Sequence, residues 1–199
     1  MGKSSGTLIL SIVVWAFLFV SCNDKKPVPK PLCYLRTDFP DHQYSKFQVR
    51  NPMFDYQFDI SNLYALRQNL GDQRYGFQEF DLGPINGSLF LYYIKIPSKD
   101  SLPAIINFAN DKVDEHKIKA DKIDFEQIIE KNKRVFGTFF ELKGNVATNF
   151  QFYLTDSVNH FVRGEVLLNC RPNYDSLRPT LEYLKLDLLE LVNNFQWKQ

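Results

Sequence analysis

The sequence predicts an α+β fold in which a mainly antiparallel sheet is covered by two amphipathic helices. Several short stretches rich in β-branched and aromatic residues alternate between apolar and polar positions, as strands do. Turn residues separate neighbouring stretches, and two longer segments carry apolar residues at helical spacing. Because strands and helices do not alternate strictly, a parallel sheet is the weaker interpretation.

The predicted strands follow from this alternation. The Gly144-Asn145 pair and the stretch 156–160 separate the last three strands and predict two successive hairpins. We expect 61–74 to be irregular. The seven predicted strands are 32–38, 53–60, 75–82, 88–96, 134–143, 148–155 and 161–169.

Each predicted helix begins with similar chemistry, a polar cap followed by a proline in the first turn. Asp100-Ser101 precedes Pro103 in the first helix, and Asp175-Ser176-Leu177 precedes Pro179 in the second. The apolar face of the first helix comprises Leu102, Ile105, Ile106, Ala109 and Val113. That of the second comprises Leu177, Leu181, Leu184, Leu188, Leu191 and Phe195.

The N-terminal segment is typical of an export signal. Lys3 is followed by a run from Leu8 to Val20 that is apolar except at Ser11. As a helix this run would reach only about 20 Å, short of a bilayer core of about 30 Å. Phe19-Val20-Ser21-Cys22 resembles a lipobox, although Phe19 replaces the usual Leu. Lipidation of Cys22 is the favoured interpretation, and ordinary signal-peptide cleavage is the alternative.

We expect three regions in the chain: a lipoprotein signal peptide at 1–21, a lipidated Cys22 with a tether at 22–31, and a single α+β domain at 32–199. The tether alternates prolines with lysines, a composition that stays extended and solvated. Its lysines would either contact anionic headgroups or serve as a soluble spacer. An acidic run directly after the lipidated cysteine resembles a signal for export to the cell surface. No such run follows Cys22, so the sequence favours a domain that faces the periplasm. We expect its anchor in the outer membrane.

Cys33 and Cys170 remain once Cys22 is assigned. An oxidising compartment would permit a disulfide between them. Two buried thiols are the alternative, because free cysteine is among the most buried residue types.

Charge and composition disfavour several classes of function. Lys3 is the one basic residue before Cys22, which leaves 23 of the 24 basic residues against 23 acidic ones. The expected mature domain is therefore near neutral and has no basic stripe for nucleic acid. We expect no cofactor, since there is no Walker loop and no dinucleotide-binding glycine motif.

Metal and catalytic sites have weak candidates. The three histidines show no zinc-binding spacing. The polar stretch of Asp111 and 114–116 is more simply a solvated helix end than a ligand set. Asp156, Ser157 and His160 have the residue types of a hydrolase triad, but the same residues suit a hairpin turn.

With these segments identified, the chain resembles the gliding motility lipoprotein GldD family. The resemblance covers nearly all of the expected mature chain, whereas Cys33 and 41–74 depart from it. It is carried by Tyr34-Leu35-Arg36, Asp38-Phe39-Pro40, the stretch from His116 to Ile123, Gly144-Asn145, Ala147, Gln151-Phe152, Thr155-Asp156-Ser157, His160-Phe161, Gly164, Pro172-Asn173, Asp175-Ser176-Leu177, Pro179, Tyr183 and Asp187.

The resemblance implies a lipid-anchored accessory protein of the cell envelope, required for gliding motility and type IX secretion and acting through protein–protein interaction. It implies no catalytic residues, so we expect a non-enzymatic protein whose partners are the membrane and other motility and secretion proteins. It also suggests that the shared polar turn with Thr155, Asp156, Ser157 and His160 serves either partner contact or turn structure. No nucleic acid or small-molecule substrate is expected. The competing hypothesis is a periplasmic hydrolase or a glycan-binding module that uses exposed aromatic side chains.

Overall fold

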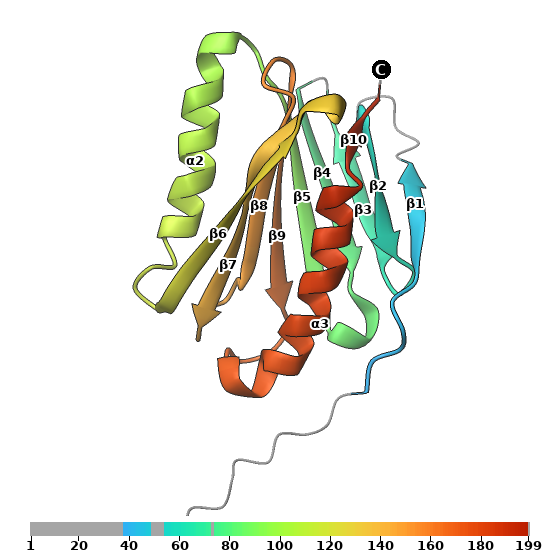
Figure 1. Cartoon of the computed structure of the whole chain (residues 1–199), viewed down its shortest axis with the longest axis vertical. Coiled ribbons are helices and arrows are strands. Elements are labelled where there is room, and N and C mark those ends of the chain that lie inside the picture. The colour runs from blue at the N-terminus through green and yellow to red at the C-terminus, as the bar shows by residue number, and fades with distance from the viewer. Residues whose placement is uncertain (1–37, 49–53, 73, 199) are drawn as a thin grey trace, which may run out of the picture. The chain divides into compact units, whose positions relative to one another are not determined.

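The computed structural model describes residues 38–48, 54–72 and 74–198, and two sheets and two α-helices dominate this part of the chain (Figure 1). The strands are β1 (Tyr44–Gln48), β2 (Tyr56–Ser61), β3 (Ala65–Gly71), β4 (Tyr75–Asp81), β5 (Gly87–Lys95), β6 (Ala120–Glu130), β7 (Val135–Gly144), β8 (Phe150–Thr155), β9 (His160–Leu168) and β10 (Gln196–Trp197). The helices are α2 (Leu102–Asp114) and α3 (Tyr174–Asn193).

The larger sheet has seven strands in the order β3-β4-β5-β9-β8-β7-β6. The smaller sheet has three strands in the order β1-β2-β10, and every pairing in both sheets is antiparallel. Helix α2 lies on one face of the larger sheet, whereas α3 and the smaller sheet lie on the other (Figure 1). The described residues therefore form a layered α+β fold, as the sequence predicts.

The main core lies between the larger sheet and the layer of α3 and β2. Leu89, Leu91 and Tyr93 point from β5 into this core and are at most 3% exposed. The core also takes Tyr56 and Phe58 from β2 and the apolar side of α3. Because side chains alternate along a strand, the intervening residues of β5 point to the opposite face, toward α2.

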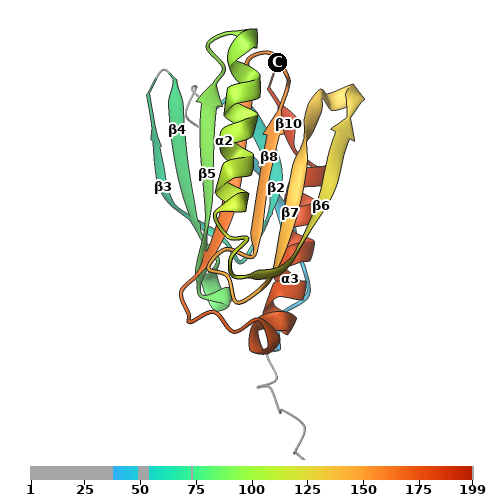
Figure 2. The same cartoon turned by 90° about the vertical axis from the view of Figure 1, so that its left-hand side faces the viewer.

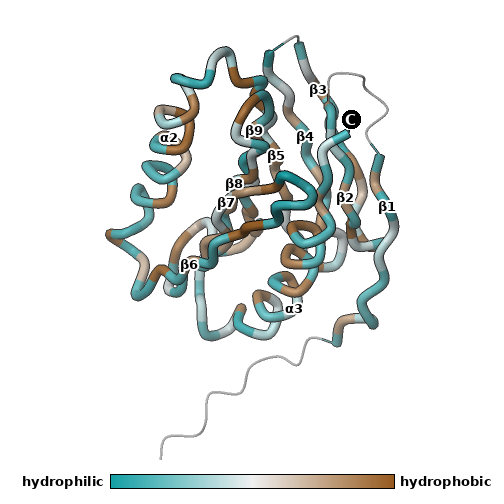
Figure 3. The backbone as a smooth tube through the Cα atoms, turned by 45° about the horizontal axis from the view of Figure 1, so that its top comes forward, coloured by the Kyte–Doolittle hydropathy of each residue, from teal (hydrophilic) through white to brown (hydrophobic). Residues whose placement is uncertain are grey.

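Helix α2 contacts that opposite face with a narrow apolar side. Ala109 packs with Ile96 and Phe161, and Val113 packs with Leu142 and Val146. Figure 3 shows the apolar side of α2 turned toward the sheet. In Figure 2, β3 and β4 on one side and β6 and β7 on the other extend beyond α2. The prediction of a sheet covered by two helices is therefore incomplete, because one helix leaves much of this face open.

Several predicted elements match the structure and others do not. The six predicted strands from 53 onward correspond to β2, β4, β5, β7, β8 and β9, and the two predicted hairpins are β7-β8 and β8-β9. The irregular segment predicted at 61–74 is wrong, because it contains β3, and β1, β6 and β10 were not predicted. The predicted strand 32–38 lies outside the described residues except for Asp38, which is in no strand.

Helix α3 begins earlier than predicted. Asn173 is the N-cap, and its side chain accepts a hydrogen bond from the Ser176 backbone N–H. Pro179 is consequently inside the helix rather than in its first turn. The Asn145 side chain also accepts from the backbone N–H of Tyr174, so the β7-β8 turn fixes where α3 starts.

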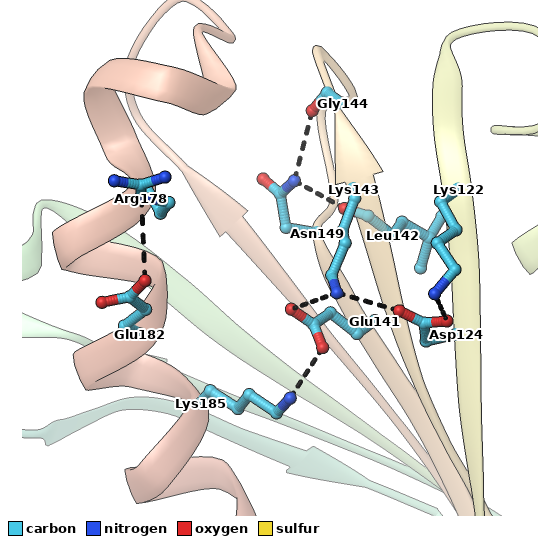
Figure 4. Close-up of polar contacts among 10 residues, drawn as sticks. All are labelled: Lys122, Asp124, Glu141, Leu142, Lys143, Gly144, Asn149, Arg178, Glu182 and Lys185. Carbon is cyan, nitrogen blue, oxygen red and sulfur yellow. Dashed lines mark hydrogen bonds and ion pairs between the residues drawn. The ribbon is translucent and has the colours of Figure 1, made fainter.

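A row of ion pairs joins α3 to the larger sheet (Figure 4). Lys185 of α3 contacts Glu141 of β7 at 2.7 Å, and Glu141 lies 4.0 Å from Lys143. Lys143 and Lys122 both bind Asp124 of β6, at 2.9 and 2.6 Å. Exposed pairs of this kind each contribute about 0–1 kcal/mol, so they orient α3 more than they stabilise it.

Candidate functional site

The predicted contact residues 155–160 form a hydrogen-bonded turn between β8 and β9. The Asp156 carboxylate accepts the backbone N–H groups of Val158, Asn159 and His160 at 2.8–2.9 Å. Burial opposes ionisation of Asp156, but these three hydrogen bonds outweigh it and lower the pKa below its usual value. Thr155 donates to the His160 carbonyl, and Ser157 has a left-handed backbone (φ 66°). This geometry supports the interpretation as a turn.

The same turn does not assemble a triad. The His160 ring bonds the hydroxyl of Tyr93 through Nδ1 at 2.7 Å and stacks on Trp197, and among the described residues no hydrogen bond joins it to Ser157. Oδ1 of Asp156 accepts three backbone N–H groups, and among the described residues no hydrogen bond joins this carboxylate to the His160 ring. Asp156 and His160 line a polar recess of about 910 Å³ beside Trp197.

Of the predicted contact residues, Thr155 and Asp156 are buried, at 3% and 8% exposure, and Ser157 and His160 are half-buried. Val158 and Asn159 at the tip of the turn are exposed.

The second candidate site is an apolar recess between α2 and strands β4 and β5, which we call the α2 groove. It encloses about 800 Å³, within the range of about 300–1,000 Å³ typical of ligand sites. Residues of β3, β4, β5 and β9 line it opposite α2, and Figure 2 shows β3 and β4 extending beyond this helix. Aromatic and aliphatic side chains dominate the lining, among them Leu70, Tyr75, Phe77, Tyr92 and Phe108.

Two pairs of opposite charges border these apolar side chains. On α2, Lys112 bonds Glu115 at 2.6 Å. On β9, Nη2 of Arg163 donates to Glu165 and also to Gln151, the latter at 3.0 Å. The spacing of three or four residues along α2 places Phe108, Lys112 and Glu115 on one side of the helix. That side forms a wall of the groove.

Arg163 is the least satisfied polar residue of the groove. Its side chain is only 10% exposed, yet Nε has no hydrogen-bond partner in the described structure. The guanidinium carbon lies 5.5 Å from the centroid of the Tyr92 ring. Burial and then the adjacent Glu165 carboxylate raise the pKa of Tyr92 to about 12. The Tyr92 hydroxyl therefore stays protonated and donates to Glu165 at 3.0 Å.

A third group, the Asp187 cluster, lies on the other side of the larger sheet. The side chain of Asp187 is fully buried on α3. It contacts Nδ1 of His42 at 2.7 Å and accepts from the hydroxyls of Tyr44 and Tyr64 at 3.0 and 2.5 Å. Tyr183 stacks on His42 with ring centroids 4.1 Å apart.

The Asp187 cluster joins the start of the described chain to the last helix. Burial, followed by the Asp187 carboxylate, raises the pKa of both Tyr44 and Tyr64, so the two hydroxyls stay protonated and keep donating. Spacing could not reveal this cluster, because more than 100 residues separate Asp187 from its partners. The resemblance pointed to Tyr183 and Asp187, but it gave no role for either residue.

The remaining predicted site residues are only partly described. Cys170 is exposed, which does not fit a buried thiol, while its suggested disulfide partner Cys33 lies outside the described residues. Cys22, the predicted lipidation site, also lies outside them. Over the described ranges, no group of three His, Cys, Asp or Glu residues is arranged to hold a metal ion. Neither described helix combines the length and apolar composition needed to span a bilayer.

The described residues form a layered α+β domain with an open groove lined mainly by aromatic and aliphatic side chains. The chain belongs to the gliding motility lipoprotein GldD family, whose sequence profile matches residues 24–197. Membership identifies a lipoprotein associated with gliding motility and implies a location in the cell envelope. A comparison with curated proteins gives no match.

Proposed function

We propose that this protein is a lipid-anchored accessory protein that supports gliding motility and type IX secretion by binding other envelope proteins. The observation that carries the proposal is the family match, which extends over residues 24–197 and thus over all described residues except Lys198. The lipobox-like Phe19-Val20-Ser21-Cys22 supplies the anchor. The domain would face the periplasm from the outer membrane, since no acidic run follows Cys22.

The accessible surfaces support a binding role. The α2 groove and the tip of the 155–160 turn, at Val158 and Asn159, present side chains to solvent. The groove exposes apolar area that a partner could bury. The hydrolase alternative gains no support from the turn, where Asp156 and His160 make other hydrogen bonds. A binding protein fits these contacts better than an enzyme at that site.

The test is a strain that lacks the gene, complemented with the wild-type chain or with variants. We expect the deletion to stop both colony spreading and secretion of type IX cargo, and the wild-type chain to restore both. A deletion strain that spreads and secretes normally would refute the proposed function.

Lipidation is tested with Cys22→Ala, using Cys170→Ala as the matched control because Cys170 is an exposed cysteine of the folded domain. We expect Cys22→Ala to lose palmitate label and to leave the membrane fraction, because a diacylglycerol anchor needs the thiol. Cys170→Ala should keep both properties. Palmitate labelling of the Cys22→Ala chain would show that this residue is not the lipid site.

A further inference from the structure

We propose that the α2 groove binds an apolar, uncharged peptide segment of a partner protein, whose backbone carbonyl oxygens accept hydrogen bonds from Arg163. The inference rests on the proposed function and deepens it, because it assigns the surface and the chemistry by which the domain would hold a partner. Four observations carry it: exposed apolar side chains, available space, balanced charge and unused donors.

Large apolar side chains from three elements meet at the groove although each faces solvent. Leu70 of β3, Tyr75 of β4 and Phe108 of α2 are 61%, 58% and 51% exposed. Single exposed apolar residues are ordinary, whereas a contiguous group that lines one recess marks an interaction site. An occupant that covered these side chains would gain about 25 cal/mol for each Å² of apolar surface removed from water.

The space beside α2 has the width of one peptide segment. Seven strands spaced about 4.8 Å apart span about 29 Å, whereas one helix covers about 10 Å. The volume of about 800 Å³ is suited to a short segment of chain rather than to a whole domain face. Figure 2 shows β3 and β4 beyond the edge of α2, and Leu70 of β3 and Tyr75 of β4 line the groove on that side.

The charges in the groove are nearly balanced and largely paired with one another. Lys112 pairs with Glu115, and Arg163 pairs with Glu165. Asp72, the remaining charged residue of the lining, accepts the backbone N–H groups of two neighbouring residues. A polyanion would find no surplus of cations here, and a strongly basic segment would find only one surplus acid. The groove therefore favours an uncharged occupant.

The unused donors of Arg163 select a peptide among uncharged occupants. Nη2 donates both hydrogen bonds of Arg163. A guanidinium has five N–H groups, so the remaining donors are unused, and Nε has no partner among the described residues. A peptide supplies a row of carbonyl acceptors together with apolar side chains for the aromatic walls. A lipid acyl chain has no acceptors along its length. An oligosaccharide carries many hydroxyl groups that this largely apolar lining would leave without partners.

The occupant is tested by photo-crosslinking in cells that produce the full-length chain. Benzoylphenylalanine replaces Phe108 or, as the matched control, Leu186, which is 54% exposed on α3 across the sheet. We expect position 108, and not 186, to form an adduct whose partner peptide is identified by mass spectrometry. A synthetic copy of that peptide should bind the purified full-length protein, about tenfold more weakly after Phe108→Asp and unchanged after Leu186→Asp.

Other outcomes overturn the inference. An adduct with a second copy of this chain, with a lipid or with a glycan would identify a different occupant. No adduct at position 108, equal adducts at both positions, or a synthetic peptide that binds Phe108→Asp as tightly as wild type would remove the groove as the peptide site.

Complementation separates this inference from the proposed function. We expect Phe108→Asp to reduce spreading at normal protein levels while Leu186→Asp spreads like wild type. If the deletion strain fails to spread but Phe108→Asp restores it fully, the groove assignment is wrong and the function stands. If both variants fail, the loss is not specific to the groove, and the inference also falls. A deletion strain that spreads normally instead refutes the function itself.

Discussion

Asp187 receives three contacts from side chains far away in the sequence and is itself fully buried. A buried carboxylate is tolerated only when donors replace the water it has lost. His42, Tyr44 and Tyr64 provide that replacement, and in doing so they hold the first described segment against α3. The position that a family resemblance singled out is therefore explained by the architecture of the domain.

We predict that Asp187→Ala lowers the free energy of unfolding by about 2–4 kcal/mol, because the half-buried Tyr44 and Tyr64 would lose the acceptor of their hydroxyls. Urea denaturation of the purified protein measures the loss. Asp111→Ala is the control, since Asp111 is exposed on α2, and it should change stability by less than about 0.5 kcal/mol. Equal effects of the two substitutions would show that the Asp187 cluster contributes nothing specific.

Among the elements, β7, β8 and β9 depend on glycines that let neighbouring chain atoms approach. A Cβ on Gly164 of β9 would lie 2.2 Å from the ring of Phe152, and one on Gly137 of β7 would lie 1.9 Å from the Tyr153 carbonyl oxygen. A phenylalanine ring can turn aside, whereas a strand carbonyl held in a ladder cannot. Replacing Gly137 should therefore destabilise the sheet more than replacing Gly164.

We predict that Gly164→Ala costs about 1–3 kcal/mol of stability and that Gly137→Ala costs more. Thermal unfolding followed by circular dichroism would rank the variants. Gly71→Ala on the edge strand β3 is the control, because the added Cβ would lie 3.3 Å from its nearest neighbour, the Tyr75 carbonyl oxygen. The explanation fails if Gly137→Ala unfolds at the same temperature as Gly71→Ala.

The elements that sequence patterns missed are at the edges of the sheets. In β6, Ile123 and Phe125 alternate with charged residues, but the adjacent Ile128 and Ile129 break the alternation. Phe125 and Ile129 are 69% and 58% exposed. Because these side chains are not buried, the strand has no continuous buried face that would produce a regular apolar pattern. Edge strand β3 is polar and mostly exposed. A central strand such as β5 is buried and was predicted with nearly correct bounds.

At the scale of the whole molecule, buried tyrosines make stability depend on alkaline pH. Burial raises the pKa of Tyr56 and Tyr93 in the main core and of Tyr64 beside Asp187. Unfolding returns these hydroxyls to a pKa of about 10. The folded protein therefore holds protons that the unfolded chain releases above that pH, and the stabilising contribution is lost as pH rises.

We predict a free energy of unfolding that is steady below about pH 10 and falls progressively above it. Denaturant titrations at successive pH values, with tyrosinate absorbance as a second signal, measure this dependence. Tyr56→Phe removes one buried group and should make the fall less steep, whatever it does to stability at neutral pH. An unchanged slope in that variant would contradict the assignment.

The sequence by itself determined the fold class, most central strands, both helices and the family resemblance. These properties follow from periodicity and from turn residues, which act over a few positions of the chain. Tertiary structure alone decided how the Asp187 cluster assembles, where α2 leaves the larger sheet open, and that Arg163 lies beneath Tyr92. The physical reason is that such contacts join residues far apart in the chain. The spacing of residue types along a short stretch of sequence does not indicate which strands become neighbours.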